Sequence, residues 1–307
     1  MEGKTDFTKL NQDHFDNEAA HYDAKHEKTT EEIARRIETR RDFIGVDWIE
    51  DDDSSEDENG DDTHRQPHRT VKVLDYACGT GSMSRFLIGL VLCPGQALAP
   101  YITQSIGIDL SEKMVAAYNV RAQNQGLTED EMAAFHGNLC VPGDESPGAF
   151  RDPKFFDFDL AVVGLGFHHF DDPELAAKRL VARLRPGGVL MIIDFLPHGP
   201  HGSDSSESHG HEHHNHHHHH HHHPHDHSHH GHHHHEEHGQ IEVEGGDASI
   251  GKALKTVTHH GFSEEHIKEI FVDAGAGKDF AIDNMGQVVF GPRHGKRTLF
   301  MARGTKA

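Results

Sequence analysis

Short apolar runs recur along this chain between longer segments that carry apolar residues at helical spacing. The runs have the length of strands and lie at residues 71–75, 105–109, 133–136, 159–163 and 189–195. The last run is almost continuously apolar, which is typical of a strand buried on both faces of a sheet. Helices are predicted at residues 7–26, 29–45, about 81–92, 111–125, 173–184 and 263–275, and two closing strands at about 279–290 and 297–302. This alternation predicts an α/β fold with a largely parallel sheet.

The first predicted helix has a narrow apolar face. In its segment F-D-x-x-A-x-x-Y-D, Phe15, Ala19 and Tyr22 fall on one side, and we interpret Phe15 and Ala19 as core residues. The second helix is predicted to begin at Thr29-Thr30-Glu31-Glu32, because acids suit a helix N-terminus. Its arginines are expected to form a solvated face beside the acidic segment that follows: Arg35, Arg36, Arg40 and Arg41.

Two stretches lack the apolar residues that a core requires. Residues 50–62 hold nine acids, and residues 198–238 hold 23 of the 35 histidines with no aliphatic or aromatic side chain. Neither can bury enough surface to offset the entropy of ordering it, so both are predicted to be disordered inserts. About 250 residues remain, a normal size for one domain. We expect an N-terminal helical segment at 1–48, an acidic linker at 49–69 and a main domain at 70–307 that contains the histidine-rich insert.

Composition narrows the function classes. The formal net charge of −22 argues against a general nucleic-acid binder, because no basic stripe is present to neutralise phosphates. The three cysteines are odd in number and widely spaced, which is typical of a reducing compartment. We find no apolar run of about 18 residues and no secretory signal. The expected location is the cytoplasm, with the nucleus as an additional location.

The most informative segment is Val73-Leu74-Asp75-Tyr76-Ala77-Cys78-Gly79-Thr80-Gly81. An apolar strand runs into an acid and then into small residues, which let the backbone of a tight turn approach a ligand. The next strand, Ser105-Ile106-Gly107-Ile108-Asp109, also ends in an acid. This order is typical of the nucleotide-binding half of a doubly wound sheet, in which Asp109 is placed to hold a ribose diol.

The spelling D-x-A-C-G-T-G, followed by G-I-D-L-S-x-x-M, resembles class I S-adenosylmethionine-dependent methyltransferases. Two more motifs fit that family in the same order, F-x-H-H-F and then L-R-P-G-G-V-L-x-I-x-D. The resemblance implies a Rossmann-like, doubly wound seven-stranded sheet over roughly residues 70–303, with S-adenosyl-L-methionine as the cofactor. The N-terminal string resembles quinone-biosynthesis-type methyltransferases, where it forms a lid, and this implies that Tyr22 is a lid residue.

The resemblance also implies contacts to the methionine and ribose parts of the cofactor, at the carboxyl ends of the strands. Ala77, Gly79 and Gly81 would let the backbone approach the methionine part, although Ala77 replaces the family's more usual glycine. Asp75 would organise this turn and, through water, the cofactor amine. Asp109 would accept hydrogen bonds from both ribose hydroxyls.

A second group of implied contacts surrounds the adenine and the acceptor. Met114 and Leu139 would border the adenine, and Asn138 would accept from its amino group through the side-chain carbonyl. Gly164 would contact the cofactor and Phe167 the acceptor.

Histidines are the candidate acid–base groups. Methyl transfer is a displacement, so alignment supplies most of the rate, and a base is needed only where the acceptor is protonated at neutral pH. His168 and His169 follow a strand end and are our candidate catalytic residues. His259, with His260 beside it, is a candidate substrate contact from the segment before the last helix. For each single histidine, a structural hydrogen-bonding role is the alternative.

The histidine tract resembles a metal-binding sequence. Neutral imidazoles such as those of His216, His218 and His220 bind zinc, nickel and copper, so the tract could retain divalent ions diffusely. It lacks the fixed ligand spacing of a structural zinc site, so no defined metal site is predicted. Low-complexity drift in a tolerated loop is the alternative.

These observations favour a methyltransferase that acts on a small organic acceptor of unspecified acceptor atom. The string T-H-H-G-F-S-E-E-x-I resembles fungal members of the family. The alternative is a regulatory subunit with the same fold, as in fungal developmental complexes, which binds protein partners and methylates a protein or nothing. A metal-buffering protein is a third interpretation and rests on the histidine tract alone.

Overall fold

The structure is a computed structural model that describes residues 6–48, 70–87, 102–197, 256–290 and 295–307. Its strands are β1 Lys72–Tyr76, β2 Gln104–Asp109, β3 Met132–His136, β4 Phe158–Gly164, β5 Leu184–Phe195, β6 Lys278–Val289 and β7 Lys296–Thr305. Its α-helices are α1 Phe7–Glu18, α2 Tyr22–Glu38, α3 Arg41–Ile44, α4 Ser82–Leu87, α5 Glu112–Asn124, α6 Pro173–Arg183 and α8 Glu264–Ala274. The acidic and histidine-rich segments predicted to be disordered inserts, with His216, His218 and His220, lie outside the described residues.

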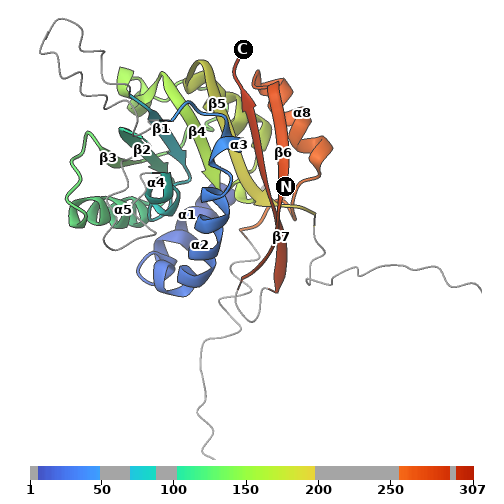
Figure 1. The fold of residues 1–307 in the computed structure, drawn as a ribbon. Coiled ribbons are helices and arrows are strands. Elements are labelled where there is room, and N and C mark those ends of the chain that lie inside the picture. The colour runs from blue at the N-terminus through green and yellow to red at the C-terminus, as the bar shows by residue number, and fades with distance from the viewer. Residues whose placement is uncertain (1–5, 49–69, 88–101, 198–255, 291–294) are drawn as a thin grey trace, which may run out of the picture.

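The strands form one sheet in the order β3-β2-β1-β4-β5-β7-β6 (Figure 1). β1 to β5 pair in parallel, whereas β7 runs antiparallel to β5 and to β6. This topology confirms the predicted doubly wound, seven-stranded α/β sheet. The direction of the strand order reverses between β1 and β4, which is where such a sheet opens a crevice for a ligand.

Alternation along each central strand divides the core into two layers. In β1, Val73 packs on the side of α2, α4 and α5, and Leu74 packs on the side of α6 and α8. β4 alternates in the same way, with Val162 on the first side and Val163 on the second. Burial of each such aliphatic side chain contributes roughly 1.5–3 kcal/mol, and coverage of both faces explains why these strands are apolar throughout.

The N-terminal helices break at a different place from the predicted one. α1 ends at Glu18 and α2 begins at Tyr22, so the chain turns at 19–21 and continues as a helix through Thr29. The sequence favoured a helix start at Thr29, but this hydroxyl instead donates to the Val289 carbonyl oxygen of β6 at 3.0 Å. A tertiary contact therefore overrides the local capping signal.

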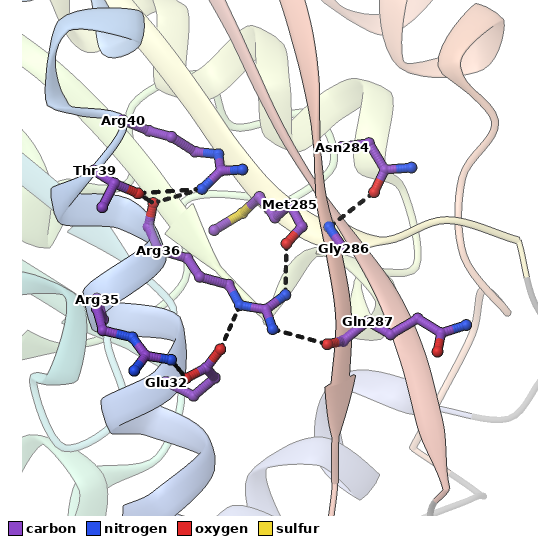
Figure 2. Close-up of polar contacts among 9 residues, drawn as sticks. All are labelled: Glu32, Arg35, Arg36, Thr39, Arg40, Asn284, Met285, Gly286 and Gln287. Carbon is purple, nitrogen blue, oxygen red and sulfur yellow. Dashed lines mark hydrogen bonds and ion pairs between the residues drawn. The ribbon is translucent and has the colours of Figure 1, made fainter.

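Two arginines, Arg36 of α2 and Arg40 just after this helix, dock the N-terminal segment on β6, contrary to the predicted solvated face. Figure 2 shows the contacts of Arg36. The Arg36 guanidinium donates to the carbonyl oxygens of Met285 at 2.5 Å and Gln287 at 2.9 Å. Arg40 donates through Nε to the Asp283 carboxylate at 2.5 Å. In contrast, the Arg35 side chain is 64% exposed and pairs with Glu32 of its own helix. The two docking arginines thus join the N-terminal segment to the far end of the sheet.

Helices of the described ranges are too short or too polar to cross a membrane.

Candidate functional site

A cavity of about 220 Å³, the main cavity, lies at the carboxyl ends of β1, β2 and β4. α1 contributes Thr8, Asn11 and Phe15 to its wall, and α2 contributes Tyr22. A second cavity of about 80 Å³ lies on the other side of the glycine turn. Both cavities are walled by Tyr22, Ala77, Gly79, Gly164 and Leu165. The site therefore sits at the reversal point of the strand order and is covered by the N-terminal helices.

The glycine turn after β1 has one glycine, Gly79, that faces the main cavity. Gly79 has φ +52, and no atom lies within 4 Å of the place that its Cβ would occupy. Gly81 serves packing instead, because a Cβ there would lie 2.7 Å from the Tyr118 ring. Ala77 also has a positive φ of 56, a conformation that a side chain disfavours by roughly 1–2 kcal/mol. Gly79 and Ala77 line the main cavity and Gly81 does not.

Asp109 lies in the cavity wall at the end of β2 and is only 8% exposed. Its Oδ2 accepts the Gly79 N–H and its Oδ1 accepts the Ser111 N–H, both at 2.8 Å. Burial raises the pKa of Asp109 above its usual value, although both N–H groups oppose the shift. Each carboxylate oxygen has a further lone pair, so this group can accept two more donors such as those of a diol.

Asp75 lies beneath the turn and is absent from the cavity wall. It is fully buried, and its Oδ2 accepts from the Ser84 N–H at 3.1 Å and the Ser84 hydroxyl at 2.7 Å. Burial raises the pKa of Asp75 to about 7. Its contact with the start of α4 indicates that Asp75 shapes the turn.

The adenine side of the cavity differs from the predicted arrangement. Met114 and Asn138 line the main cavity, but Leu139 is 1% exposed and does not. The Asn138 carbonyl already accepts from the Tyr76 hydroxyl at 3.0 Å and from the Cys140 N–H at 2.7 Å. A backbone N–H only donates, so the amide orientation is settled. Asn138 therefore presents its NH₂ group, a donor, and not the predicted acceptor.

His169 belongs to the 3₁₀ turn Phe167–His169 after β4 and lines the main cavity. Its Nδ1 lies 2.8 Å from the Thr256 carbonyl oxygen, which can only accept, so Nδ1 carries the proton and Nε2 keeps its lone pair. Burial, followed by the neighbouring His168, holds the pKa of His169 well below 6.5. At neutral pH this side chain is thus a neutral imidazole.

His168 lies behind His169 and is not in the wall of either cavity. Its Nδ1 is 2.9 Å from Asp194 Oδ1, and its backbone N–H donates to Asp194 Oδ2 at 3.0 Å. The two imidazole ring centres are 4.1 Å apart. His168 is therefore placed to position His169, and the prediction that both histidines face the acceptor is not supported by this geometry.

Two other predicted acceptor contacts lie away from the cavity. Phe167 is 0% exposed and packs against Phe262 and Phe170 in the core, so its role is structural. His259 is absent from both cavity walls, and its backbone N–H donates to the His168 carbonyl oxygen at 3.1 Å. It supports the turn from behind.

α1 contributes residues that the sequence interpretation missed. The Asn11 side-chain NH₂ donates to the His169 carbonyl oxygen at 3.0 Å, and the Phe15 ring lies edge-on at 5.2 Å from the His169 ring. Asp16 accepts from the Ser111 hydroxyl at 2.6 Å, next to Asp109. Phe15 is thus a cavity residue and not the predicted core residue. The sequence signal for this role was the string F-D-x-x-A-x-x-Y-D, whose resemblance to other methyltransferases implied a lid.

Tyr22, the predicted lid residue, lies in the wall shared by both cavities. Burial, with smaller contributions from Asp109 and Glu18, raises the pKa of Tyr22 to about 12. Its hydroxyl therefore stays protonated. The neighbouring Asp23 accepts from the Thr80 hydroxyl at 2.6 Å and pairs with Arg121, which fixes the start of α2 beside the glycine turn.

A family model described as a methyltransferase domain matches residues 26–239 of this chain. This match covers more than half of the chain, including the strands that form the cavity. The chain belongs to the methyltransferase domain family. S-adenosyl-L-methionine is the cofactor that this family implies.

Individual relatives match over shorter lengths. An uncharacterized methyltransferase of Schizosaccharomyces pombe is 30% identical over 135 residues, which are 43% of this chain and 42% of that protein. A demethylmenaquinone methyltransferase of Thermus thermophilus is 29% identical over 126 residues, 41% of this chain and 48% of that protein. The chain thus matches less than half of the length of these curated relatives.

Solved structures resemble the chain at low identity. A putative methyltransferase of Haloferax volcanii, solved with a Trm112 activator, has a TM-score of 0.48 and 15% identity, covering 95% of this chain and 96% of that one. Phosphoethanolamine N-methyltransferase 2 of Haemonchus contortus, solved with S-adenosyl-L-methionine, has a TM-score of 0.44 and 14% identity, covering 78% and 50%. The activity of this chain does not follow from these two structures.

The residues present fit the cofactor. The open space over Gly79 would take a group that a Cβ would exclude, and Asp109 has the lone pairs for a ribose diol. Met114 supplies an apolar surface for a base, and Asn138 supplies a donor for a ring nitrogen. Within the described ranges, no three of the histidine, cysteine or acidic side chains gather as metal ligands.

Proposed function

We propose that this chain is an S-adenosylmethionine-dependent methyltransferase that acts on a small organic acceptor. The observation that carries the proposal is the open Gly79 position with Asp109 in the same cavity wall, on a family-typical turn. When bound, the cofactor would supply an electrophilic methyl group on sulfur, with its demethylated form as the leaving group.

The residues of the chain orient the reactants and handle one proton. Asp109 holds the ribose side, and Tyr22 with Gly79 closes the space between the two cavities. The α1 residues cover the site and exclude water, which strengthens electrostatic contacts inside it. His169 Nε2 is the base that takes the proton of an acceptor which carries one, and His168 with Asp194 holds the imidazole in place.

Binding and transfer are tested separately on the full chain. Calorimetry should show binding of S-adenosyl-L-methionine and of S-adenosylhomocysteine. Methyl-labelled cofactor, mixed with the protein and a small-molecule extract, should then transfer its label to a low-molecular-weight product. Binding without any transfer would favour the regulatory-subunit alternative, and absence of cofactor binding would contradict the proposed methyltransferase activity.

A further inference from the structure

Tyr22 brings an aromatic ring to the boundary between the two cavities. Among the described residues that wall both cavities, Tyr22 alone is aromatic. It is the first residue of α2, and its ring packs against the ring of His26, one turn further along the helix, with 4.7 Å between the ring centres. Because burial raises the pKa of Tyr22 to about 12, the side chain is uncharged at neutral pH.

The ribose contact indicates where the sulfur of the cofactor would lie. In S-adenosyl-L-methionine the positively charged sulfur, a sulfonium, is joined to the ribose through a single carbon atom. Asp109, which has the lone pairs for the ribose diol, accepts the N–H of Gly79, a residue of the shared wall. The charge of Asp109 also contributes to the raised pKa of Tyr22, which indicates that the two side chains are near each other. The sulfonium would therefore lie beside the shared wall that contains Tyr22.

The cavity walls offer a positive charge few other partners. Among the described residues, no charged side chain walls the second cavity, and the charged residues of the main cavity wall are Asp109, Asp171 and Asp172. Asp171 and Asp172 are exposed, so water weakens their attraction for a cation. An aromatic ring attracts a cation through the negative face of its π-system, most strongly where water is excluded. An uncharged sulfur gains no such attraction from the same ring.

We propose that the Tyr22 ring recognises the positive charge of the sulfonium and strengthens the binding of S-adenosyl-L-methionine relative to that of its uncharged product, S-adenosylhomocysteine. This inference rests on the proposed function, because it requires the site to bind this cofactor. Methyl transfer leaves an uncharged sulfur beside the ring, so the attraction is lost once the reaction is complete. Tyr22 thus favours the exchange of the used cofactor for a fresh molecule.

The test measures the affinity of the full chain for both molecules by calorimetry, in the parent and in three variants. Tyr22→Leu removes the ring, and Tyr22→Phe keeps the ring but removes the hydroxyl. Phe15→Leu is the matched control, because Phe15 is an aromatic residue that walls the main cavity alone. Tyr22→Leu should raise the Kd of S-adenosyl-L-methionine about ten-fold relative to the Kd of S-adenosylhomocysteine, equivalent to ~1.4 kcal/mol. Tyr22→Phe and Phe15→Leu should keep the parental ratio of the two Kd values.

A third ligand separates the charge from the methyl group. It is the uncharged analogue of S-adenosyl-L-methionine in which a carbon atom that bears the methyl group replaces the sulfur, and Tyr22→Leu should not weaken its binding relative to S-adenosylhomocysteine. An equal loss for this analogue, an unchanged ratio in Tyr22→Leu, or a lost preference in Tyr22→Phe would overturn the inference and leave the proposed function standing. If the parent binds neither S-adenosyl-L-methionine nor S-adenosylhomocysteine, both the proposed function and the inference fail. Tyr22→Met also removes the ring and replaces Tyr22→Leu if thermal melts show the leucine variant to be unfolded.

Discussion

At the scale of the residue, the Asp109 carboxylate accepts one backbone N–H on each oxygen, and these contacts hold the turn ready for a ligand. Asp109→Ala should remove two charge-assisted bonds to the ribose, so cofactor binding should weaken by roughly 2–4 kcal/mol. Calorimetry with S-adenosyl-L-methionine measures the loss. Asp130→Ala, at an exposed acid before β3, is the control and should bind as the parent does. Unchanged affinity of Asp109→Ala would refute the ribose contact.

Asp75 should make stability depend on pH. Burial raises the pKa of Asp75 from 3.8 to about 7, so the folded chain retains a proton that the unfolded chain releases between these values. The stabilisation from this proton is complete below pH ~4 and is lost as the pH rises to ~7, by as much as ~4 kcal/mol. Asp75→Asn keeps acceptors for Ser84 and cannot titrate.

Urea unfolding of the parent and Asp75→Asn at several pH values checks this expectation. The variant should gain stability relative to the parent between pH ~4 and ~7, and the difference should be constant above pH ~8. A difference that does not change with pH would show that Asp75 titrates normally in the folded chain.

At this scale, the sequence predicted the cavity residues that belong to recognisable family motifs. Asp109, Gly79 and Met114, for which the resemblance implied cofactor contacts, line the cavity. It failed for His168 and Phe167, because adjacent residues in a tight turn point in different directions and only the fold decides which one faces the ligand. Asn11 had no motif at all. Its position depends on how α1 crosses the sheet, which no local pattern encodes.

At the scale of the element, Arg36 is the principal link between α2 and β6. The side chain is 22% exposed and bonds two carbonyl oxygens and Glu32. Arg36→Ala should leave carbonyls unpaired and reduce the free energy of unfolding by about 1–3 kcal/mol. Arg35→Ala removes only an exposed pair within α2 and should change it by less than ~0.5 kcal/mol. Denaturant unfolding of both variants measures these changes. Equal losses of unfolding free energy would mean that the contacts of Arg36 with β6 contribute nothing to stability.

Helix and strand positions were largely predictable because their apolar periods differ, and each central strand was found within a few residues. The boundary of α2 was not. Thr29 has a good local capping signal, but its hydroxyl is used by Val289, more than 200 residues away in sequence. The arginine face of α2 was misjudged for the same reason, since charged side chains are also the natural partners of unpaired strand carbonyls.

At the scale of the whole molecule, the chain after residues 198–255 returns to the end of β5. The Phe262 N–H donates to the Phe195 carbonyl oxygen at 2.9 Å. A shorter connection can therefore join β5 to this returning segment, and deletion of 201–236 should leave cofactor affinity within about two-fold of the parent. Thermal melts and cofactor titrations check this. A large loss of melting temperature would contradict the predicted dispensability of the insert.

Thr258→Ala tests the neighbouring segment that the deletion leaves intact. The Thr258 hydroxyl donates to the carbonyl oxygens of His168 at 2.9 Å and Phe170 at 2.8 Å, and so holds the histidine turn. We expect kcat to fall about ten-fold with cofactor affinity unchanged, equivalent to ~1.4 kcal/mol in the transition state. Thr258→Ser keeps the hydroxyl and should restore most of the rate. Equal kcat values for Thr258→Ala and Thr258→Ser would show that the Thr258 hydroxyl is not needed to hold the histidine turn.

The site as a whole joins segments that lie far apart in the sequence, and this assembly was only partly foreseeable. The rule that ligands bind at the carboxyl ends of parallel strands located the crevice. The closure by α1 and the role of Thr256, which sets the proton position on His169, depend on contacts across 158 and 87 residues. Such contacts follow from the complete packing and not from any one segment.

The α2 contacts with β6 have a consequence for solubility. β6 is the last strand of the sheet, and its outward carbonyls at Met285, Gln287 and Val289 are all occupied by side chains of α2. An unprotected strand of this kind is a template on which another chain can add, the first step of aggregation. α2, which helps to cover the cavity, therefore also prevents another chain from pairing with β6. Loss of α2 would expose both the cavity and a strand edge on which chains can polymerise.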